Sequence, residues 1–254
     1  MVELTEYLDV AQVVLYVFWA FFAVLLFYLQ AESRREGYPV ESDETGDYDK
    51  DPWLYMPSPK TFKLPHGHGE VSVPNDIRDT RPIKAERPNE WFGGALVPIG
   101  DPLYDAIGPG AYAERADRPD LNAEGEPVIR PMSIATNFTI EERDPDPRGM
   151  TVTTADGETA GTITDIWIDT AELQIRYFEV DTGDGHKVLL PLGFAAMRKK
   201  KGDFYVHALL SDQIKHVPQI ASKEQITLLE EEKICAFYGG GQLYATRERS
   251  EPII

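Results

Sequence analysis

The sequence predicts one membrane-spanning helix, a mainly β domain and a C-terminal helix. Three observations predict this fold class: an uncharged apolar run at residues 10–31, a series of short strand-like runs after residue 138, and a capped apolar pattern that begins at Ser222. The chain has 254 residues. The part that follows the apolar run is therefore long enough for one sizeable domain or two small ones.

The apolar run VAQVVLYVFWAFFAVLLFYLQA at residues 10–31 contains no charged side chain. A helix of this length, rising about 1.5 Å per residue, crosses the hydrocarbon core of a bilayer, which is about 30 Å thick. A cleaved signal peptide needs a basic start and a shorter apolar core, whereas this run is long and follows acidic residues. We therefore expect an uncleaved, single-pass anchor.

The charges on either side of the anchor predict its orientation. Arg34 and Arg35 follow the run, and no basic residue precedes it. The positive-inside rule then places the body of the protein in the cytoplasm and residues 1–9 on the other side of the membrane. Because each arginine can gain about 1 kcal/mol from anionic head groups, we predict that Arg34 and Arg35 lie at the lipid surface.

Residues 32–132 show no convincing periodicity and are rich in proline. Each proline removes a backbone donor and biases its neighbour to extended geometry, so no long helix can run through this part. Apolar residues such as Trp53, Trp91 and Tyr104 are nevertheless spread through it. We expect an extended segment that buries these residues on the surface of partner subunits.

Residues 133–254 are predicted to form the β domain with its C-terminal helix. The run 150–169 indicates two strands joined by an Asp156-Gly157 turn. Further strand-like runs lie at 175–180, 187–190, 195–198 and 204–208. Short strands at this spacing predict a small, strongly bent sheet or barrel.

The C-terminal helix is expected to begin at Ser222, which forms a capping box with Gln225. We expect Glu230–Glu232 to form a solvated face and the helix to end at the glycines 239–241. The glycine run follows a helix rather than opening one, so it does not predict a phosphate site. The apolar face comprises Ile226, Leu229 and Ile234.

Composition and motifs exclude several functions. A net charge of −18 disfavours nucleic-acid binding. The single cysteine, Cys235, excludes an intrachain disulfide. The five histidines show no spacing typical of a metal site, and no hydrolase motif or phosphate loop is present. We therefore predict no metal site and no enzyme with its own active site.

Two groups of carboxylates remain as candidate chemistry. By spacing alone they are best interpreted as surface ion pairs, which contribute little. The alternative is that mutual repulsion raises some of their pKa values, so that they pass protons near neutral pH. The first group comprises Asp117, Asp120, Glu124 and Glu126, and the second comprises Asp165, Asp169, Glu172 and Glu179 with Arg176.

The whole chain resembles the H-subunit family of the purple-bacterial photosynthetic reaction centre. The resemblance depends on seven blocks that occur in family order from end to end. These are DVAQVVLY at 9–16, YLQAESRREGYP at 28–39, PKTFKLPHG at 59–67, GDPLYDAIGP at 100–109, DPRGMTV at 146–152, AGTITDIWID at 160–169 and TLLEEEKICAFYGGG at 227–241.

The resemblance implies a cytoplasmic domain built around a PRC barrel, on an inner (intracytoplasmic) membrane. It implies a chain without pigment that caps and stabilises the L and M subunits and helps to deliver protons to the secondary quinone bound in L. Bacteriochlorophyll, bacteriopheophytin, quinones, non-haem iron and carotenoid are expected in L and M. Further candidate partners are light-harvesting 1 polypeptides, a cytochrome subunit and anionic phospholipids.

The resemblance also assigns site residues. Asp169, Glu172 and Arg176 match the family segment beneath the quinone. Asp117 and Asp120 match acids near the place where protons enter.

At that place some relatives carry an aspartate and a His-Gly-His sequence. This chain has Asn122 followed by Glu124, Gly125 and Glu126. Glu124 and Glu126 can still collect protons, but transition metals should bind weakly without imidazole ligands.

Three alternatives stay open at this point. The first is a membrane-anchored PRC-barrel scaffold or assembly factor with no role in proton transfer. The second is a relative of soluble ribosome-maturation factors, which the anchor and the acidity disfavour. The third is a membrane-anchored hydrolase, for which the sequence offers no catalytic constellation.

Overall fold

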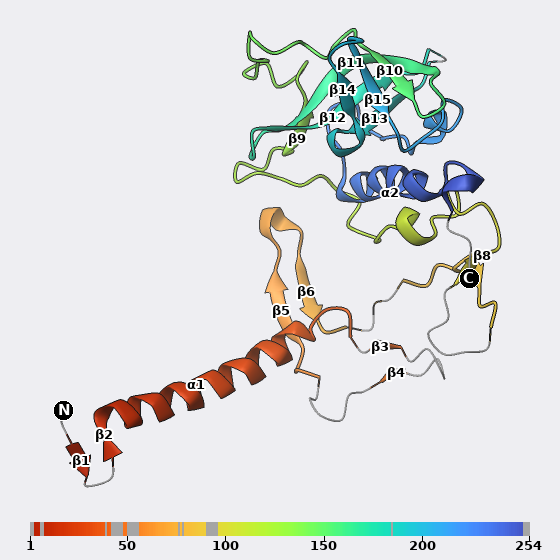
Figure 1. Cartoon of the computed structure of the whole chain (residues 1–254). Helices are drawn as coiled ribbons and strands as arrows, with labels where there is room; N and C mark the ends of the chain where they lie inside the picture. Colours follow the sequence, from red (N-terminus) through yellow and green to blue (C-terminus); the bar gives the residue numbers. More distant parts are fainter. Residues whose placement is uncertain are drawn as a thin grey trace. The chain divides into compact units, whose positions relative to one another are not determined.

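The computed structural model describes most of the chain (Figure 1), namely residues 3–5, 8–38, 40–41, 48–49, 56–75, 77, 79–89, 96–183 and 185–250. The chain divides into two compact units, one of residues 1–80 and 90–94 and the other of residues 81–89 and 95–254. Trp53 and Trp91, on which the predicted apolar contacts of the extended segment partly depend, lie outside the described residues.

Helix α1 (Val10–Ser33) is the main element of the first unit. The Asp9 carboxylate accepts a hydrogen bond from the Gln12 backbone N–H at 2.8 Å, and the Gln12 side chain accepts one from the Asp9 N–H at 3.3 Å. This capping box fixes the start of the helix. None of its residues is buried, and it is the one helix among the described residues that is long and apolar enough to cross a membrane.

The end of α1 is tied to a β-hairpin of β5 (Lys60–Lys63) and β6 (Glu70–Val73). The Arg35 guanidinium donates to both carboxylate oxygens of Glu32, at 2.8 and 2.9 Å, which is the bidentate geometry that gives strong pairs. It also donates to the carbonyls of Ser58 (2.8 Å) and Val73 (3.1 Å). One side chain thus joins the helix end to both sides of the hairpin.

Two further short strand pairs belong to the first unit. They are β1 (Glu3–Thr5) with β2 (Leu8–Asp9), and β3 (Val40–Glu41) with β4 (Tyr48–Asp49). In the second unit β7 (Ala85–Glu86) pairs with β8 (Val97–Pro98).

A seven-stranded sheet forms the centre of the second unit, in the order β13-β12-β11-β10-β15-β14, with β9 also paired to β11. All neighbours are antiparallel except β10 and β15, which are parallel. The strands are β9 (Ile129–Pro131), β10 (Thr151–Thr154), β11 (Thr159–Asp169), β12 (Gln174–Asp181), β13 (Lys187–Pro191), β14 (Ala196–Arg198) and β15 (Asp203–Val206). The predicted strands are therefore present, with small shifts at their ends.

Strand β11 gives the sheet its bend. It spans 11 residues, pairs with β10 near its start and with β9 near its end, and has two register shifts against β12. Such irregularities bend and twist a strand. Among the described strands the two outermost, β13 and β14, do not pair with each other, so the predicted small barrel is a strongly bent sheet that hydrogen bonds do not close.

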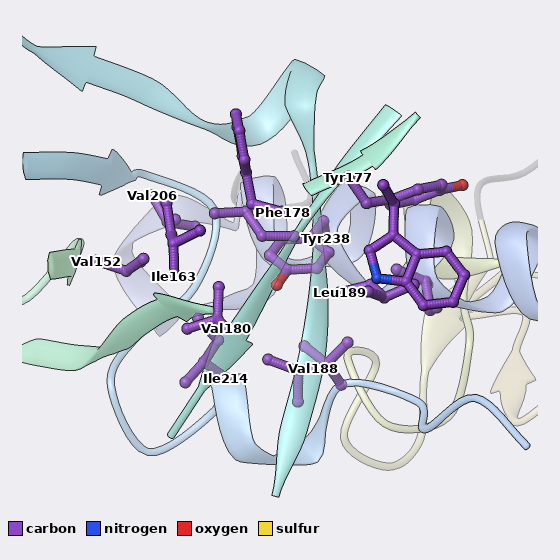
Figure 2. Packing of buried hydrophobic residues seen from close by; sticks show 14 of the residues in the cluster. Val152, Ile163, Tyr177, Phe178, Val180, Val188, Leu189, Val206, Ile214 and Tyr238 are labelled. Carbon is purple, nitrogen blue, oxygen red and sulfur yellow. The ribbon is translucent and has the colours of Figure 1, made fainter. Parts of the chain in front are cut away.

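The core lies inside this bend and is closed by helix α2 (Leu228–Tyr244) (Figure 2). Phe178 on β12 lies 4.8 Å from Phe204 on β15, measured between ring centroids, and Tyr238 of α2 stacks on Phe194 at 5.5 Å. Full burial of one such apolar side chain contributes roughly 1.5–3 kcal/mol. Leu103, Val128 and Ile129 also belong to the core, so the compact unit includes residues before the predicted domain boundary at 133.

Two expectations about α2 are wrong. The helix is capped by Thr227 with Glu230, not by Ser222 with Gln225. It also continues through the glycines 239–241, none of which has a positive φ. Side chains bind carbonyl groups at the end of the helix instead. The Gly241 carbonyl accepts a hydrogen bond from the Arg249 guanidinium at 3.0 Å, and the Ala245 carbonyl accepts one from the Gln213 amide at 2.8 Å. A glycine cap is therefore not needed.

Close packing explains the glycine run. A Cβ on Gly239 would lie 2.9 Å from the Pro109 carbonyl oxygen, and one on Gly240 would lie 3.0 Å from the Gly110 Cα. Figure 1 shows α2 lying beside this segment, which forms the 3₁₀ turn Gly108–Gly110. Gly239 and Gly240 therefore let two backbones approach, which any side chain would prevent.

The Asp156-Gly157 turn between β10 and β11 is held by a carboxylate. Burial alone would raise the pKa of Asp156. Hydrogen bonds from the Thr154 hydroxyl, from the Ser211 N–H and hydroxyl and from the Glu158 N–H outweigh burial and lower the pKa from 3.8 to about 2. A charged Asp156 thus joins this turn to Ser211.

We expect Gly241→Ala to destabilise the fold by about 1–2 kcal/mol, because overpacking usually costs about 1–3 kcal/mol. The new Cβ would lie 2.4 Å from the Ala208 carbonyl oxygen and 2.5 Å from the Leu209 Cδ2. Gly193→Ala is the control, since nothing lies within 4 Å of a Cβ there. Thermal melting of the full chain in detergent measures both variants. An increase in stability of the Gly241 variant, as helix propensity alone would give, would contradict the packing account.

We expect Asp156→Asn to remove part of the acid sensitivity of the fold. Because the folded pKa lies below the unfolded value, the charged carboxylate stabilises the protein above pH 3.8, and this contribution is lost as the pH falls towards about 2. Melting temperatures of both proteins between these pH values test this. The variant should show the shallower pH dependence, and parallel curves would refute the assignment.

Candidate proton-handling site

The turn between β11 and β12 holds the first predicted site residue, Asp169. Its side chain is 6% exposed, and its Oδ1 accepts from the N–H groups of Ala171 (3.0 Å) and Glu172 (2.8 Å). These bonds shape the turn. Leu173 at the turn has φ +57°, a backbone conformation that is rare for a residue with a side chain. Its side chain is 73% exposed.

Glu172 and Arg176 lie on either side of the turn, but they do not pair with each other. Glu172 is exposed and accepts a hydrogen bond from the side-chain amide of Gln174. The Arg176 Nη2 atom instead lies 3.8 Å from the Glu231 Oε2 atom on α2. The positive charge near the turn is therefore shared with a carboxylate that sequence spacing did not identify.

The acids predicted to lie where protons enter are exposed on a small loop. Asn122 holds this loop by accepting from the N–H groups of Glu124 (3.1 Å) and Glu126 (2.9 Å). Glu126 also lies 3.4 Å from Arg130. The carboxylates of Glu124 and Glu126 thus remain at the surface, where they can exchange protons with water.

The start of α2 joins this loop to the rest of the site. The Asp117 carboxylate accepts from the Thr227 hydroxyl at 2.8 Å, and the Leu228 N–H donates to the Arg118 carbonyl at 3.0 Å. Burial raises the pKa of the Glu231 carboxyl, and the nearby charge of Asp120 adds to this rise. The two predicted groups of acids are thus bridged by the first turns of α2.

Glu231 is the site residue that the sequence interpretation missed. Its side chain is 14% exposed, and its Oε2 atom accepts a 2.8 Å hydrogen bond from the hydroxyl of Tyr177. Figure 2 shows this hydroxyl directed away from Phe178 and Val180. Glu231 precedes Ile234 and Tyr238 by three and seven residues, so it falls on the same helix face as these two fully buried side chains. This spacing is the sequence signal that could have identified Glu231.

The other two glutamates of the predicted solvated face also have partners. Glu230 accepts from the N–H groups of Ala221 (2.6 Å) and Thr227 (2.8 Å). Glu232 lies 3.3 Å from Arg115. The three glutamates at the start of α2 therefore all make contacts with other parts of the fold.

The two arginines after the anchor are less accessible than a lipid-facing role suggests. Arg34 is 6% exposed, with its guanidinium carbon 5.5 Å from the centre of the Tyr38 ring. The Arg35 side chain is 13% exposed and bound as described above. Their contact with lipid head groups stays a prediction.

The described residues contain no group of three or more His, Cys, Asp or Glu side chains arranged to hold a metal ion. His66 and His68, which are separated by one glycine in the sequence, have ring centroids 6.4 Å apart. The geometry of the site is that of carboxylates, arginines and one buried tyrosine. Such a set can bind and exchange protons.

Comparison with known families decides the assignment. Residues 2–134 match the photosynthetic reaction centre H-chain N-terminal region, and residues 140–213 match the PRC-barrel domain. The first match covers more than half of the chain. The chain belongs to the photosynthetic reaction centre H-chain family.

Membership of the H-chain family confirms the predicted relationship and accounts for the two parts of the chain. The first match contains α1 and the loop of carboxylates, and the second contains β10–β15. As an H chain, the protein associates with other reaction centre subunits. The roles of individual site residues are taken up below.

Proposed function

We propose that this H chain caps the L and M subunits on the cytoplasmic side and conducts protons to the secondary quinone bound in L. One observation carries the proposal for proton conduction. Asp169 and Glu172 share one turn, and strand β12 leads from that turn to Arg176, which lies 3.8 Å from Glu231 on α2. Thr227, at the start of the same helix, donates to Asp117. Exposed and buried proton-binding groups therefore lie on neighbouring elements of one unit.

The two acids of the turn differ in a way that suits proton transfer. Glu172 is exposed and can exchange protons with water, whereas Asp169 is 6% exposed and largely withdrawn from it. The turn therefore places one carboxyl group at the surface and another beneath it.

The turn also offers a surface for a partner subunit. Exposed Leu173 lies beside a groove whose apolar lining includes Phe138, Ile140 and Ile175. Exposed apolar side chains gathered in this way are typical of protein contacts. Capping by L and M would cover Leu173 and bring Glu172 to the covered interface.

The carboxylates of the loop would gather protons for this turn. Asp117, Asp120, Glu124 and Glu126 are exposed, and the whole chain carries a net charge of −18. A surface with one sign of charge raises the local concentration of ions of the opposite sign. Protons would be collected over this surface even though the loop has no histidine.

The remaining parts of the assembly are proposed from the family. The chain would cross the inner membrane once, with residues 1–9 in the periplasm and the β domain in the cytoplasm. L and M would hold bacteriochlorophyll, bacteriopheophytin, quinones, non-haem iron and carotenoid, and this chain would hold none. Light-harvesting 1 polypeptides, a cytochrome subunit and anionic phospholipids are further partners in this proposal.

A scaffold role without proton transfer is the second candidate. It is favoured by the hydrogen bonds of Asp169, since a carboxylate that accepts from two N–H groups of its own turn has a structural use. Asparagine in place of aspartate keeps Oδ1 as an acceptor but cannot carry a proton between groups. Substitution with asparagine therefore separates the two roles.

We expect the double variant Asp169→Asn, Glu172→Gln to slow proton uptake after the second flash by about 10²-fold, the lower end of what a positioned proton-transfer group contributes. Proton uptake by the purified reaction centre is followed with a pH-indicator dye.

The matched control is Glu158→Gln with Asp212→Asn, which removes two exposed negative charges elsewhere on the β domain. The control should keep the normal rate. Equal rates in the two double variants would support the scaffold role and contradict proton conduction by the turn.

A further inference from the structure

A single carboxyl group, that of Glu231, stands between the loop of carboxylates and the β11–β12 turn. Its Oε2 atom accepts from the Tyr177 hydroxyl at 2.8 Å and lies 3.8 Å from the Arg176 Nη2 atom. Both contacts use the same oxygen. The other oxygen, Oε1, is therefore the one to which a proton can add without breaking the bond from Tyr177.

The groups around Glu231 come from three elements. Strand β12 supplies Tyr177 and Arg176, and the segment before β9 supplies Arg115 and Asp120. Helix α2 itself supplies Cys235, whose Sγ atom lies 3.9 Å from the Tyr177 hydroxyl. Helix α2 also supplies Glu232, which is paired with Arg115 at 3.3 Å. Glu231 is thus a largely buried acid that has both cationic and anionic side chains near it.

The groups around Glu231 have opposite effects on the pKa of its carboxyl group. Burial raises the pKa of Glu231 above its ordinary value of 4.5. The hydrogen bond from Tyr177 and the charges of Arg176 and Arg115 lower the pKa, and the charge of Asp120 raises it. The balance favours a carboxyl that is more readily protonated than a surface glutamate.

Tyr177 acts as a fixed donor in this arrangement. Its side chain is 2% exposed, and burial raises the pKa of the hydroxyl far above its ordinary value. The hydroxyl therefore keeps its proton and donates to Glu231 at all relevant pH values. The proton that exchanges must be the one on the carboxyl group.

We infer that Glu231 is a proton-binding relay residue that links the carboxylates of the loop at Asp117–Glu126 to the turn at Asp169–Arg176. The inference rests on the proposed function and deepens it by naming the connecting group. A proton leaves an acid of the loop or its water, adds to Glu231 Oε1 and later departs towards the turn. Glu231 returns to the charged form, so protons and charge balance over one cycle.

Protonation of Glu231 also changes the field at the turn. The neutral carboxyl no longer offsets the charge of Arg176, and that positive charge then acts more strongly on Asp169 and Glu172.

The test is light-induced infrared difference spectroscopy on the purified reaction centre containing the full chain. Reduction of the quinone should produce a carboxyl C=O band in the native complex that is lost in Glu231→Gln. Glu232→Gln removes a charge from the next residue of α2 and should keep the band. Retention of the band in Glu231→Gln, or its loss in both variants, would overturn the inference.

A second variant separates a proton-binding role from a structural one. Tyr177→Phe keeps the buried ring but removes the hydrogen bond that stabilises the charged carboxylate. The band attributed to Glu231 should therefore titrate at higher pH than in the native complex. An unchanged titration would contradict the proposed contact, since loss of packing alone does not move the pKa of a specific carboxyl.

Failure of this inference can be told apart from failure of the proposed function. If Asp169→Asn with Glu172→Gln slows proton uptake but Glu231→Gln keeps both the band and the rate, protons reach the turn by another route and only the inference fails. If neither variant slows uptake, the proposed function fails and the inference fails with it. If both slow uptake and the band is lost, both stand.

Discussion

The antiparallel pairing of β11 with β12 determines where each candidate proton-handling residue lies. Trp167 is the register partner of Tyr177, and Asp169 is the partner of Gln174 at the turn. Since side chains alternate between the faces of a strand, a slip of one residue would turn Tyr177 to the opposite face of the sheet, away from α2. The hydroxyl would then lose Glu231, and Arg176 would lose its carboxylate partner. Packing in the core and chemistry at its edge therefore depend on the same register.

The strands were predictable from the sequence because each is short, apolar and bounded by a turn. The two strands predicted on either side of the Asp156-Gly157 turn correspond to β10 and β11, and the run at 175–180 corresponds to β12, with small shifts at the ends. Helix α1 was predictable because an uncharged run of that length has few alternatives. In both cases local patterns decide the outcome, and distant contacts only confirm it.

The features that could not be predicted depend on contacts between distant segments. Ser222 and Thr227 both offer a capping box, and only the docking of α2 against Arg118 and the core selects Thr227. The glycines 239–241 favour a helix end locally, but they lie inside the helix because the backbone of residues 109 and 110 approaches the first two and the Ala208 carbonyl approaches the third. Glu231 was assigned to solvent because it lies in a run of three glutamates, whereas its burial depends on Tyr177, which lies 54 residues earlier in the chain.

The two units carry the two parts of the proposed role. In the first, Arg35 ties the end of α1 to the β5–β6 hairpin, so the apolar helix ends in a fixed structure rather than a loose tether. In the second, the bent sheet and α2 hold acids at graded depths, from exposed Glu124 to largely buried Glu231. The proposed anchor and the proposed proton-handling surface thus belong to different units of one H chain.

The most direct test of this account is flash-induced proton uptake by reaction centres from which this chain has been removed and to which it is then restored. The account predicts slow uptake after the second flash in the depleted complex and recovery of the native rate when the full chain is added back. Equal rates with and without the chain would contradict a role in conducting protons to the secondary quinone.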